Sequence, residues 1–237
     1  MNIFTKFPAI LMIGIPLLFV SCGKETEPDK PVIPDAVDLG LSVKWASFDV
    51  GATKPGEFGT YFAWGETETK SGYFWKNYAL CNGSRTSITK YNSNEDFGHP
   101  VDNLHTLKPE DDVAHLQYGG RWRMPTAAEI KELIECPFLV LSLETVGHVT
   151  CLKITSEKTG NSILFPPGGT SSGAWGVLGD TSGRFWTSEI DPSPSSPNHP
   201  AFAITLQTTS VIEDHISSLS LEHVERHIGL NVRAVCQ

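Results

Sequence analysis

Apolar and polar residues alternate in short segments along most of the chain, and residues that favour turns separate these segments. Alternation with a period of two is typical of β-strands that bury one face. The pattern predicts strands over residues 36–48, 58–64, 138–143, 148–155, 162–165, 185–188, 202–207 and 230–235. Residues 65–107 are instead rich in Gly, Ser, Asn and Thr, which predicts a long region of turns and loops.

Two segments carry helix signals. Residues 109–112 read Pro-Glu-Asp-Asp and predict a short helix to about residue 117, because proline fits the first turn and carboxylates favour the positive end of a helix. Thr126 and Glu129 form a capping box, in which each side chain bonds the backbone N–H of the other residue. This second helix is expected to end at Cys136 and Pro137. Few helices, many short strands, 21 glycines and 16 prolines predict an irregular α+β fold.

The first 21 residues have the pattern of an export signal. Lys6 provides a positive start, and residues 9–20 form an apolar stretch that is too short and too interrupted by Pro and Gly to span a membrane. Residues 19–22, Phe-Val-Ser-Cys, resemble the lipobox of bacterial lipoproteins, in which the signal is cut before a cysteine that is then acylated. We therefore expect lipidation at Cys22; an ordinary secretory signal with a chance cysteine is the alternative.

Residues 22–35 are predicted to form a flexible tether. They are polar and contain several prolines, so they cannot bury a core. At roughly 3.3 Å per residue they reach about 45 Å when extended. Residues 23–29, Gly-Lys-Glu-Thr-Glu-Pro-Asp, resemble the acidic segment that directs Bacteroidetes lipoproteins to the outer face of the outer membrane. The resemblance implies a lipid-anchored protein that faces the cell exterior, with residues 36–237 as its one domain.

The net charge of the chain argues against two kinds of partner. It is −9, and removal of the predicted signal with Lys6 would make it −10. A chain this acidic is unsuited to nucleic acid and has no basic patch for anionic lipid. Membrane contact is therefore expected through the lipid anchor alone.

The cell envelope is oxidising, so the cysteines beyond the lipobox are candidates for two disulfides. They are Cys81, Cys136, Cys151 and Cys236. Three pairings are open to four cysteines, and we favour Cys136 with Cys151 because the residues between them can fold back as a hairpin. The spacing contains no tight pair of the kind that binds zinc, so no metal is predicted there.

A series of short blocks resembles one known family. The blocks are residues 37–46 (Val-Asp-Leu-Gly-Leu-Ser-Val-Lys-Trp-Ala), 50–52, 61–67, 111–115, 119–126 (Gly-Gly-Arg-Trp-Arg-Met-Pro-Thr), 160–166, 185–188 and 229–235. In this order they are similar to the Fibrobacter succinogenes major paralogous domain of Bacteroides surface lipoproteins. The resemblance implies a C-type-lectin-like fold related to formylglycine-generating enzymes, with paired first and last strands, two flanking helices and a long loop region that carries the ligand surface.

The tryptophans within these blocks are expected to be structural, because each buries about 150–250 Å² in a protein core. They are Trp45, Trp64, Trp122 and Trp186. Arg121 and Arg123 flank the third of them. One of these arginines is expected to form a structural ion pair with an acid such as Asp111 or Asp112.

The motifs that suggest catalysis or metal binding lack the context that such chemistry needs. Residues 169–173 read Gly-Thr-Ser-Ser-Gly, but a hydrolase serine requires a helix directly after it, and a glycine-rich run follows here. His223 and His227 have a metal-binding spacing only on a helix; on a strand they lie about 13 Å apart. The reactive cysteine pair and the iron site of related enzymes cannot be mapped onto the chain. We therefore predict a non-enzymatic protein without a cofactor.

Recognition through loops remains as the function, because loops on a rigid scaffold commonly carry binding residues. Exposed aromatic rings could stack on sugars or anchor a protein, although Trp75 and Trp175 could equally pack locally. Residues 187–237 hold a single aromatic residue and several histidines, so a contact there would titrate near pH 6–7. The candidate ligand-binding residues are Tyr73, Trp75, Trp175, His199, His215, His223 and His227.

We thus predict a surface-exposed binding module or adhesin for a glycan or a protein. The alternative is a structural accessory or tip subunit of a surface appendage or envelope complex. A reproducible soluble ligand would favour the first, and co-purification with envelope subunits would favour the second.

Overall fold

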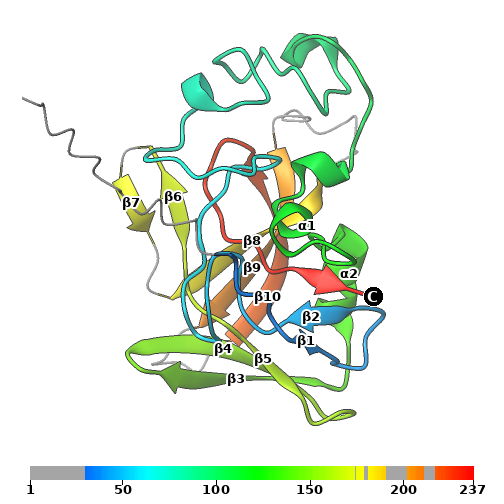
Figure 1. The fold of residues 1–237 in the computed structure, drawn as a ribbon, viewed down its shortest axis with the longest axis vertical. Coiled ribbons are helices and arrows are strands. Elements are labelled where there is room, and N and C mark those ends of the chain that lie inside the picture. Colours follow the sequence, from blue (N-terminus) through cyan, green and yellow to red (C-terminus); the bar gives the residue numbers. More distant parts are fainter. Residues whose placement is uncertain (1–29, 174, 179–180, 191–201, 211–216) are drawn as a thin grey trace, which may run out of the picture. The chain divides into compact units, whose positions relative to one another are not determined.

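The computed structural model describes residues 30–173, 175–178, 181–190, 202–210 and 217–237. Its α-helices are α1 (Val113–Tyr118) and α2 (Ala127–Glu135), and turns of 3-10 helix cover Trp75–Asn77, Glu95–Phe97 and Pro109–Asp111. The strands are β1 (Ala36–Val37), β2 (Lys44–Ala46), β3 (Leu139–Val146), β4 (Val149–Ser156), β5 (Ser162–Phe165), β6 (Thr170–Ser172), β7 (Trp175–Leu178), β8 (Ser182–Ile190), β9 (Phe202–Ser210), β10 (Ser217–Glu225) and β11 (Val235–Cys236). Figure 1 shows the long loop region at the end of the molecule opposite β3.

The strands form small antiparallel sheets with the orders β1-β2-β11, β3-β4-β5, β8-β9-β10 and β6-β7. Trp45 in β2 lies opposite Val37 of β1 on one side and Val235 of β11 on the other. The last strand therefore pairs with the sheet of the first two, as predicted. Two helices with many short antiparallel strands confirm a mixed α+β fold.

Several segments differ from the strand predictions. Of residues 230–235 only Val235 belongs to a strand, β11, and β6 and β7 form where no strand is predicted. Residues 36–48 form two short strands, because the chain turns between them at Gly40, whose φ of +77° suits glycine. Residues 58–64 make only an isolated bridge from Phe62 to Leu230. Residues 217–225 were not predicted as a strand, yet they form β10, which pairs with β9 along its whole length.

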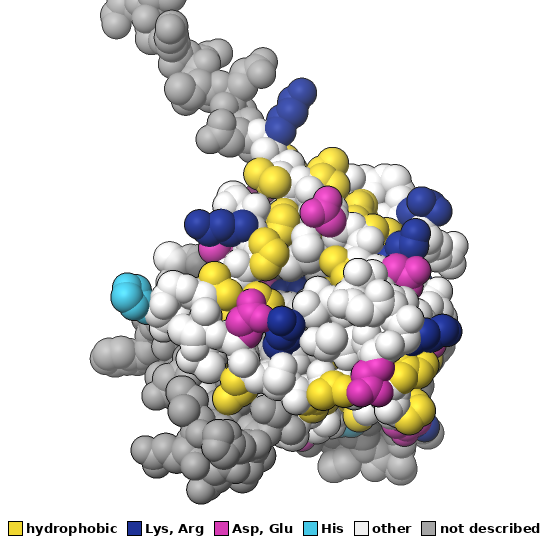
Figure 2. All heavy atoms as spheres, turned by 90° about the horizontal axis from the view of Figure 1, so that it is seen from below, with side chains coloured by type: hydrophobic (Ala, Val, Ile, Leu, Met, Phe, Trp, Pro, Cys, Tyr) yellow, Lys and Arg dark blue, Asp and Glu magenta, His cyan; other side chains and the backbone are white. Residues whose placement is uncertain are grey.

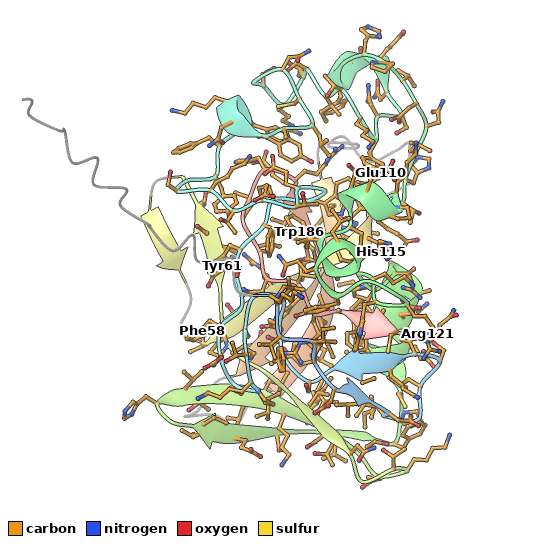
Figure 3. The ribbon with its side chains drawn as sticks, in the orientation of Figure 1. Phe58, Tyr61, Glu110, His115, Arg121 and Trp186 are labelled. Atoms are coloured by element: carbon orange, nitrogen blue, oxygen red, sulfur yellow. The ribbon has the colours of Figure 1, made fainter. Side chains whose placement is uncertain are left out.

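The core confirms the structural role of three of the predicted tryptophans. Trp64 and Trp186 are fully buried in one hydrophobic cluster, and Trp45 is fully buried in a second one with Phe165 and Phe185. Each of the first two indoles donates to a backbone carbonyl, that of Thr187 or of Phe62. Trp122 is half-buried and packs against the first cluster. Figure 3 shows Trp186 inside the molecule and Arg121 at its surface.

The predicted capping box forms at the N-terminus of α2, and the predicted arginine ion pair forms there with a different acid. Glu129 N–H donates to Thr126 Oγ1 over 3.2 Å, and Thr126 N–H donates to Glu129 Oε2 over 2.8 Å. Arg123 forms a bidentate ion pair with this same Glu129, in which Nη1 donates to Oε2 at 2.8 Å and Nη2 donates to Oε1 at 2.5 Å. The predicted partner Asp112 instead caps α1, where it accepts from the N–H groups of His115 and Met124. The arginine pair is thus structural, but its partner lies on α2.

The described thiols form no disulfide, so the predicted pairings are wrong in this structure. Cys81, Cys136, Cys151 and Cys236 are all free. The expected hairpin does form, but Cys151 lies opposite Glu144 near its turn, whereas Cys136 precedes the strand end at Leu139, which lies opposite Ser156. The five residues from Cys151 to Ser156 span about 16 Å, far beyond the roughly 7 Å that a disulfide allows between Cα atoms.

Residues 31–237 form one compact unit, and its fold begins within the predicted tether. Pro34 is buried. Asp35 N–H donates to Ser47 Oγ over 3.1 Å, and Ser47 N–H donates to the Asp35 carbonyl over 3.0 Å. Within the part of the chain that the structure describes, no helix has both the length and the apolar character needed to cross a membrane.

Candidate functional site

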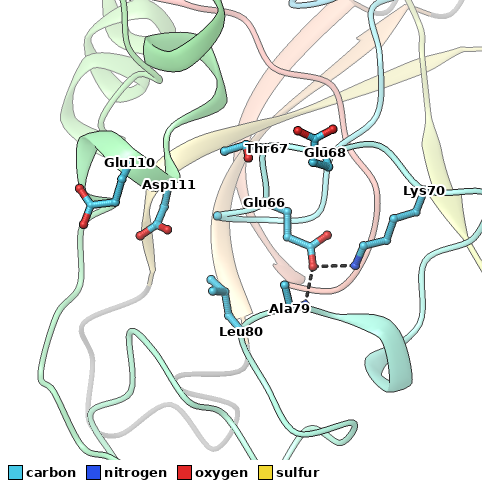
Figure 4. A pocket seen from close by; sticks show the side chains of 9 residues that line it. Glu66, Thr67, Glu68, Lys70, Ala79, Leu80, Glu110 and Asp111 are labelled. Atoms are coloured by element: carbon cyan, nitrogen blue, oxygen red, sulfur yellow. Dashed lines mark hydrogen bonds and ion pairs between the residues drawn. The ribbon is translucent and has the colours of Figure 1, made fainter.

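An acidic pocket of about 280 Å³ opens where the long loop region meets the segment before α1 (Figure 4). Three separate segments build it, namely residues 65–70, residues 79–80, and the 3-10 turn at residues 110–111. Gly65 holds the first bend at a φ of +74°, and a Cβ there would meet the Leu80 side chain at 2.8 Å. The positive φ therefore favours glycine at this bend, where Leu80 packs closely against it.

Glu66 is the buried carboxylate of this pocket. It is 6% exposed, and its Oε1 accepts from Lys70 Nζ at 2.6 Å and from Ala79 N–H at 2.5 Å. Lys70 also donates to the Asn77 carbonyl. The ion pair thus lies within the first wall, and the bond from Ala79 N–H connects that wall to the second. The other oxygen, Oε2, is buried and has no hydrogen-bond partner among the described residues.

The opposite wall carries two further carboxylates. Asp111 Oδ2 accepts from Lys90 Nζ and from the Tyr91 hydroxyl, and burial together with this bond raises the pKa of Tyr91. Glu110 is 61% exposed and lies 4.0 Å from Lys90. With the exposed Glu68, four carboxylates and one lysine, Lys70, line the pocket, and Lys90 pairs with Asp111 from outside this lining. The excess negative charge favours ligands that donate hydrogen bonds or carry a positive charge, and it disfavours anions.

Trp75 and His227 form an aromatic shelf beside Lys70. Their ring centroids lie 4.7 Å apart at an angle of 36°, and Trp75 meets Tyr78 edge-on at 5.7 Å. Lys70 Nζ lies 5.9 Å from the Tyr78 ring, and its charge acts on His227. Lys70 thus belongs to the pocket and lies beside Tyr78 and His227, the two rings that contact the half-buried Trp75.

Arg226 attaches the long loop to the core directly behind this shelf. It is fully buried, and its guanidinium donates to the Tyr91 carbonyl at 3.0 Å, to the Lys90 carbonyl at 2.9 Å and to the Tyr78 hydroxyl at 3.0 Å. It also lies over the Trp64 ring at 4.7 Å. One side chain from the end of β10 therefore holds three points of the loop that carries the site.

Of the predicted ligand-binding residues that the structure describes, Trp75 and His227 lie together, but His227 is buried at 9% exposed, which contradicts its prediction as a surface contact. Tyr73 is 3% exposed and its hydroxyl donates to the Tyr61 carbonyl, which contradicts its prediction as a surface contact. His223 is exposed on β10. Trp175 belongs to β7, but its side chain is not described. His199, His215 and the lipidation candidate Cys22 lie outside the described residues.

Sequence reasoning missed the acidic pocket itself. Glu66 and Lys70 stand four residues apart, and the sequence pattern at residues 110–111 predicts only a helix start. Those acids do begin a 3-10 turn, but they also form one wall of the pocket. Comparison of the chain with protein-family models, with curated proteins and with solved structures finds no match.

The environment of His227 predicts a pH dependence of stability. Burial lowers the pKa of His227 below 6.5, and Lys70 adds to this shift while Glu225 opposes it. The unfolded chain then binds a proton at higher pH than the folded chain does, so stability falls as pH decreases from 6.5 towards the lowered pKa. This places the titration of His227 below the window expected from sequence. Urea unfolding of His227→Gln should show a weaker pH dependence there than native protein. An unchanged dependence, or an equal effect of His223→Gln, would contradict the assignment.

Proposed function

We propose that this protein is a lipid-anchored lipoprotein of the outer membrane that faces the cell exterior and recognises a glycan or protein ligand through its long loop region. The observation that carries the proposal is the acidic pocket with the Trp75–His227 shelf beside it. The long loop region supplies most of both, while the 3-10 turn before α1 completes the pocket and the segment after β10 supplies His227. The lipobox at Cys22 and the acidic residues after it support the location.

The resemblance to the Fibrobacter succinogenes major paralogous domain supports the same function. A C-type-lectin-like fold would join its first and last strands and carry ligands on its long loop, and this chain has both the joined strands and the pocket on the loop. The motif at residues 169–173 supports binding over hydrolysis, because β6 leads into the strand β7 rather than into a helix.

The charge of the pocket defines the ligand class. Exposed carboxylates such as Glu68 and Glu110 accept hydrogen bonds from hydroxyl or ammonium groups, and a half-buried ring such as Trp75 can stack on the apolar face of a sugar. We therefore propose a neutral or amine-bearing ligand, such as a hydroxyl-rich glycan or a lysine-bearing protein surface. Sulfated, phosphorylated and uronic-acid ligands are disfavoured by the same charge.

Neutralising the pocket is expected to weaken binding. The full-length protein, purified in detergent, would first be applied to a glycan array and to a pull-down from envelope extracts. For any ligand found, Glu68→Gln and Glu110→Gln should each reduce affinity by about 3- to 10-fold, since the amide oxygen still accepts a hydrogen bond and only the contribution of the charge, about 1 kcal/mol, is lost. Glu135→Gln, an equally conservative change at an exposed position of α2, should leave affinity unchanged.

Each outcome of this experiment separates the proposal from its alternatives. If Glu68→Gln, Glu110→Gln and Glu135→Gln all bind with the affinity of the native protein, the ligand binds elsewhere on the chain. Co-purification with envelope subunits and no soluble ligand would favour a structural accessory or tip subunit. Incorporation of labelled fatty acid into the native chain, and its loss in Cys22→Ala, tests the anchor separately.

A further inference from the structure

Strand β3 is an outer edge strand with unused pairing capacity. It pairs with β4 along all eight of its residues, from Leu139 opposite Ser156 to Val146 opposite Val149, without a register shift. No second strand pairs with β3 within the described residues. In Figure 1 it lies at the end of the molecule remote from the long loop region, so it is separate from the acidic pocket.

The hairpin turn decides which backbone groups of β3 face outward. Gly147 and His148 form a two-residue turn, with a φ of +63° at Gly147. In such a turn the flanking residues, here Val146 and Val149, exchange two backbone hydrogen bonds. Along the strand, hydrogen-bonded pairs then alternate with pairs that exchange no hydrogen bond. The even-numbered residues of β3 therefore bond to β4. The N–H and C=O groups of Leu141, Leu143 and Thr145 point away from the sheet, and no described residue bonds to them.

This edge lacks the features that commonly protect edge strands. Proteins block free edges with prolines, bulges or unpaired charges, and β3 contains no proline and no bulge. Its single charge, Glu144, is already paired with Lys153 of β4 at 2.6 Å. Val140 is 45% exposed on the outward face. Figure 2, seen from the β3 side, shows hydrophobic side chains interspersed with charges of both signs rather than a charged barrier.

We propose that β3 pairs antiparallel with β3 of a second copy of this chain, about a two-fold axis at Leu143. The side chains on the same face of the strand as Val140 are Ser142, Glu144 and Val146; Val140 and Ser142 are exposed, whereas Glu144 is half-buried and Val146 is half-buried beside Gly56. An axis at Leu143 places Val140 opposite the second copy's Val146, and Ser142 opposite its Glu144, to which the serine hydroxyl can donate. It also pairs the free backbone N–H and C=O groups of Leu141 in one copy with those of Thr145 in the other.

The neighbouring registers are less favourable. An axis one residue earlier, at Ser142, keeps the backbone hydrogen bonds but sets Val140 against a carboxylate. An axis one residue later, at Glu144, places Glu144 of one copy opposite Glu144 of the other, and like charges directly opposite each other are destabilising. The side chains thus select the axis at Leu143. A contact of one strand pair is small and therefore weak in solution, and it strengthens when both copies are held on one membrane.

Two single cysteine variants test both the pairing and its register. In the proposed dimer Ser142 and the second copy's Glu144 form a non-hydrogen-bonded pair, with Cα atoms about 4.5 Å apart, which a disulfide can bridge. Full-length Ser142→Cys and Glu144→Cys, purified in detergent, should form a cross-linked dimer when mixed and oxidised. Neither variant alone should cross-link above the native chain, whose own cysteines provide the background.

The results that would overturn the proposal are distinct. A disulfide dimer of Ser142→Cys alone would place the axis at Ser142, and one of Glu144→Cys alone would place it at Glu144. If no mixture cross-links and light scattering gives the mass of one chain at every concentration, β3 does not pair with itself. For the native protein, the mass from light scattering should instead rise from one chain to two as concentration increases. Val140→Lys should raise the concentration at the midpoint of dimerisation at least tenfold, while its circular dichroism spectrum stays that of the native protein.

Discussion

Replacement of Arg233 by methionine is expected to lower the free energy of unfolding by about 3–5 kcal/mol. Arg233 is 1% exposed, and its Nε donates to Asp49 Oδ1 at 2.6 Å. The same guanidinium donates to the carbonyls of Ala46 at 3.1 Å and Leu164 at 2.7 Å, and it lies over the Phe165 ring at 4.5 Å. Without it, the buried Asp49 carboxylate and two carbonyls lose their donor.

Urea unfolding at neutral pH would measure this loss, with Arg121→Met as a matched control. Arg121 is exposed, so its replacement should change the stability by no more than about 0.5 kcal/mol. Burial raises the pKa of Asp49, and removal of Arg233 adds to that shift. Because protonation relieves the unpaired charge, the difference between native and variant protein should narrow as pH falls. A loss below about 1 kcal/mol at neutral pH, or a difference that does not narrow, would contradict the paired role.

Local sequence signals predicted the elements whose determinants lie close together in the chain. The capping box of α2 needs only Thr126 and Glu129, three residues apart, and it forms as expected. The hairpin of β3 and β4 follows from alternating side chains around the Gly147-His148 turn. The burial of Trp45, Trp64 and Trp186 follows from the cost of exposing large apolar rings.

Features that depend on contacts distant in sequence were not predicted. Arg226 lies in a histidine- and glutamate-rich segment that resembles a solvated surface, and Arg233 lies in the predicted strand over residues 230–235, yet both are enclosed by backbone carbonyls and aromatic rings. The strand β10 was missed because its Ser, Glu and His residues weaken the apolar alternation. The acidic pocket joins Glu66 to Asp111 across the whole loop, and no spacing rule relates them. The disulfide prediction rests on the compartment and on the hairpin between Cys136 and Cys151, and neither fixes the distance between the two thiols.

Replacement of Arg226 by lysine is expected to release the long loop and to weaken ligand binding at the same time. Lysine keeps the charge, but its single nitrogen cannot reach the Tyr78 hydroxyl and the carbonyls of Lys90 and Tyr91 together, nor lie flat over Trp64. We expect a loss of about 2–3 kcal/mol in stability, because hydrogen bonds to a charged donor are lost in a buried site.

Amide hydrogen exchange would locate the effect of Arg226→Lys. Exchange should accelerate within residues 78–92, whereas the hairpin of β3 and β4 should keep its protection while the domain stays folded. Affinity for a ligand of the pocket should fall, because the loop that carries Glu66 and Trp75 would occupy its binding conformation for a smaller fraction of time. If the loop exchanges faster and affinity stays unchanged, the binding site lies away from the long loop. If exchange rises evenly over the whole domain, Arg226 supports the core as a unit rather than the loop that carries the site.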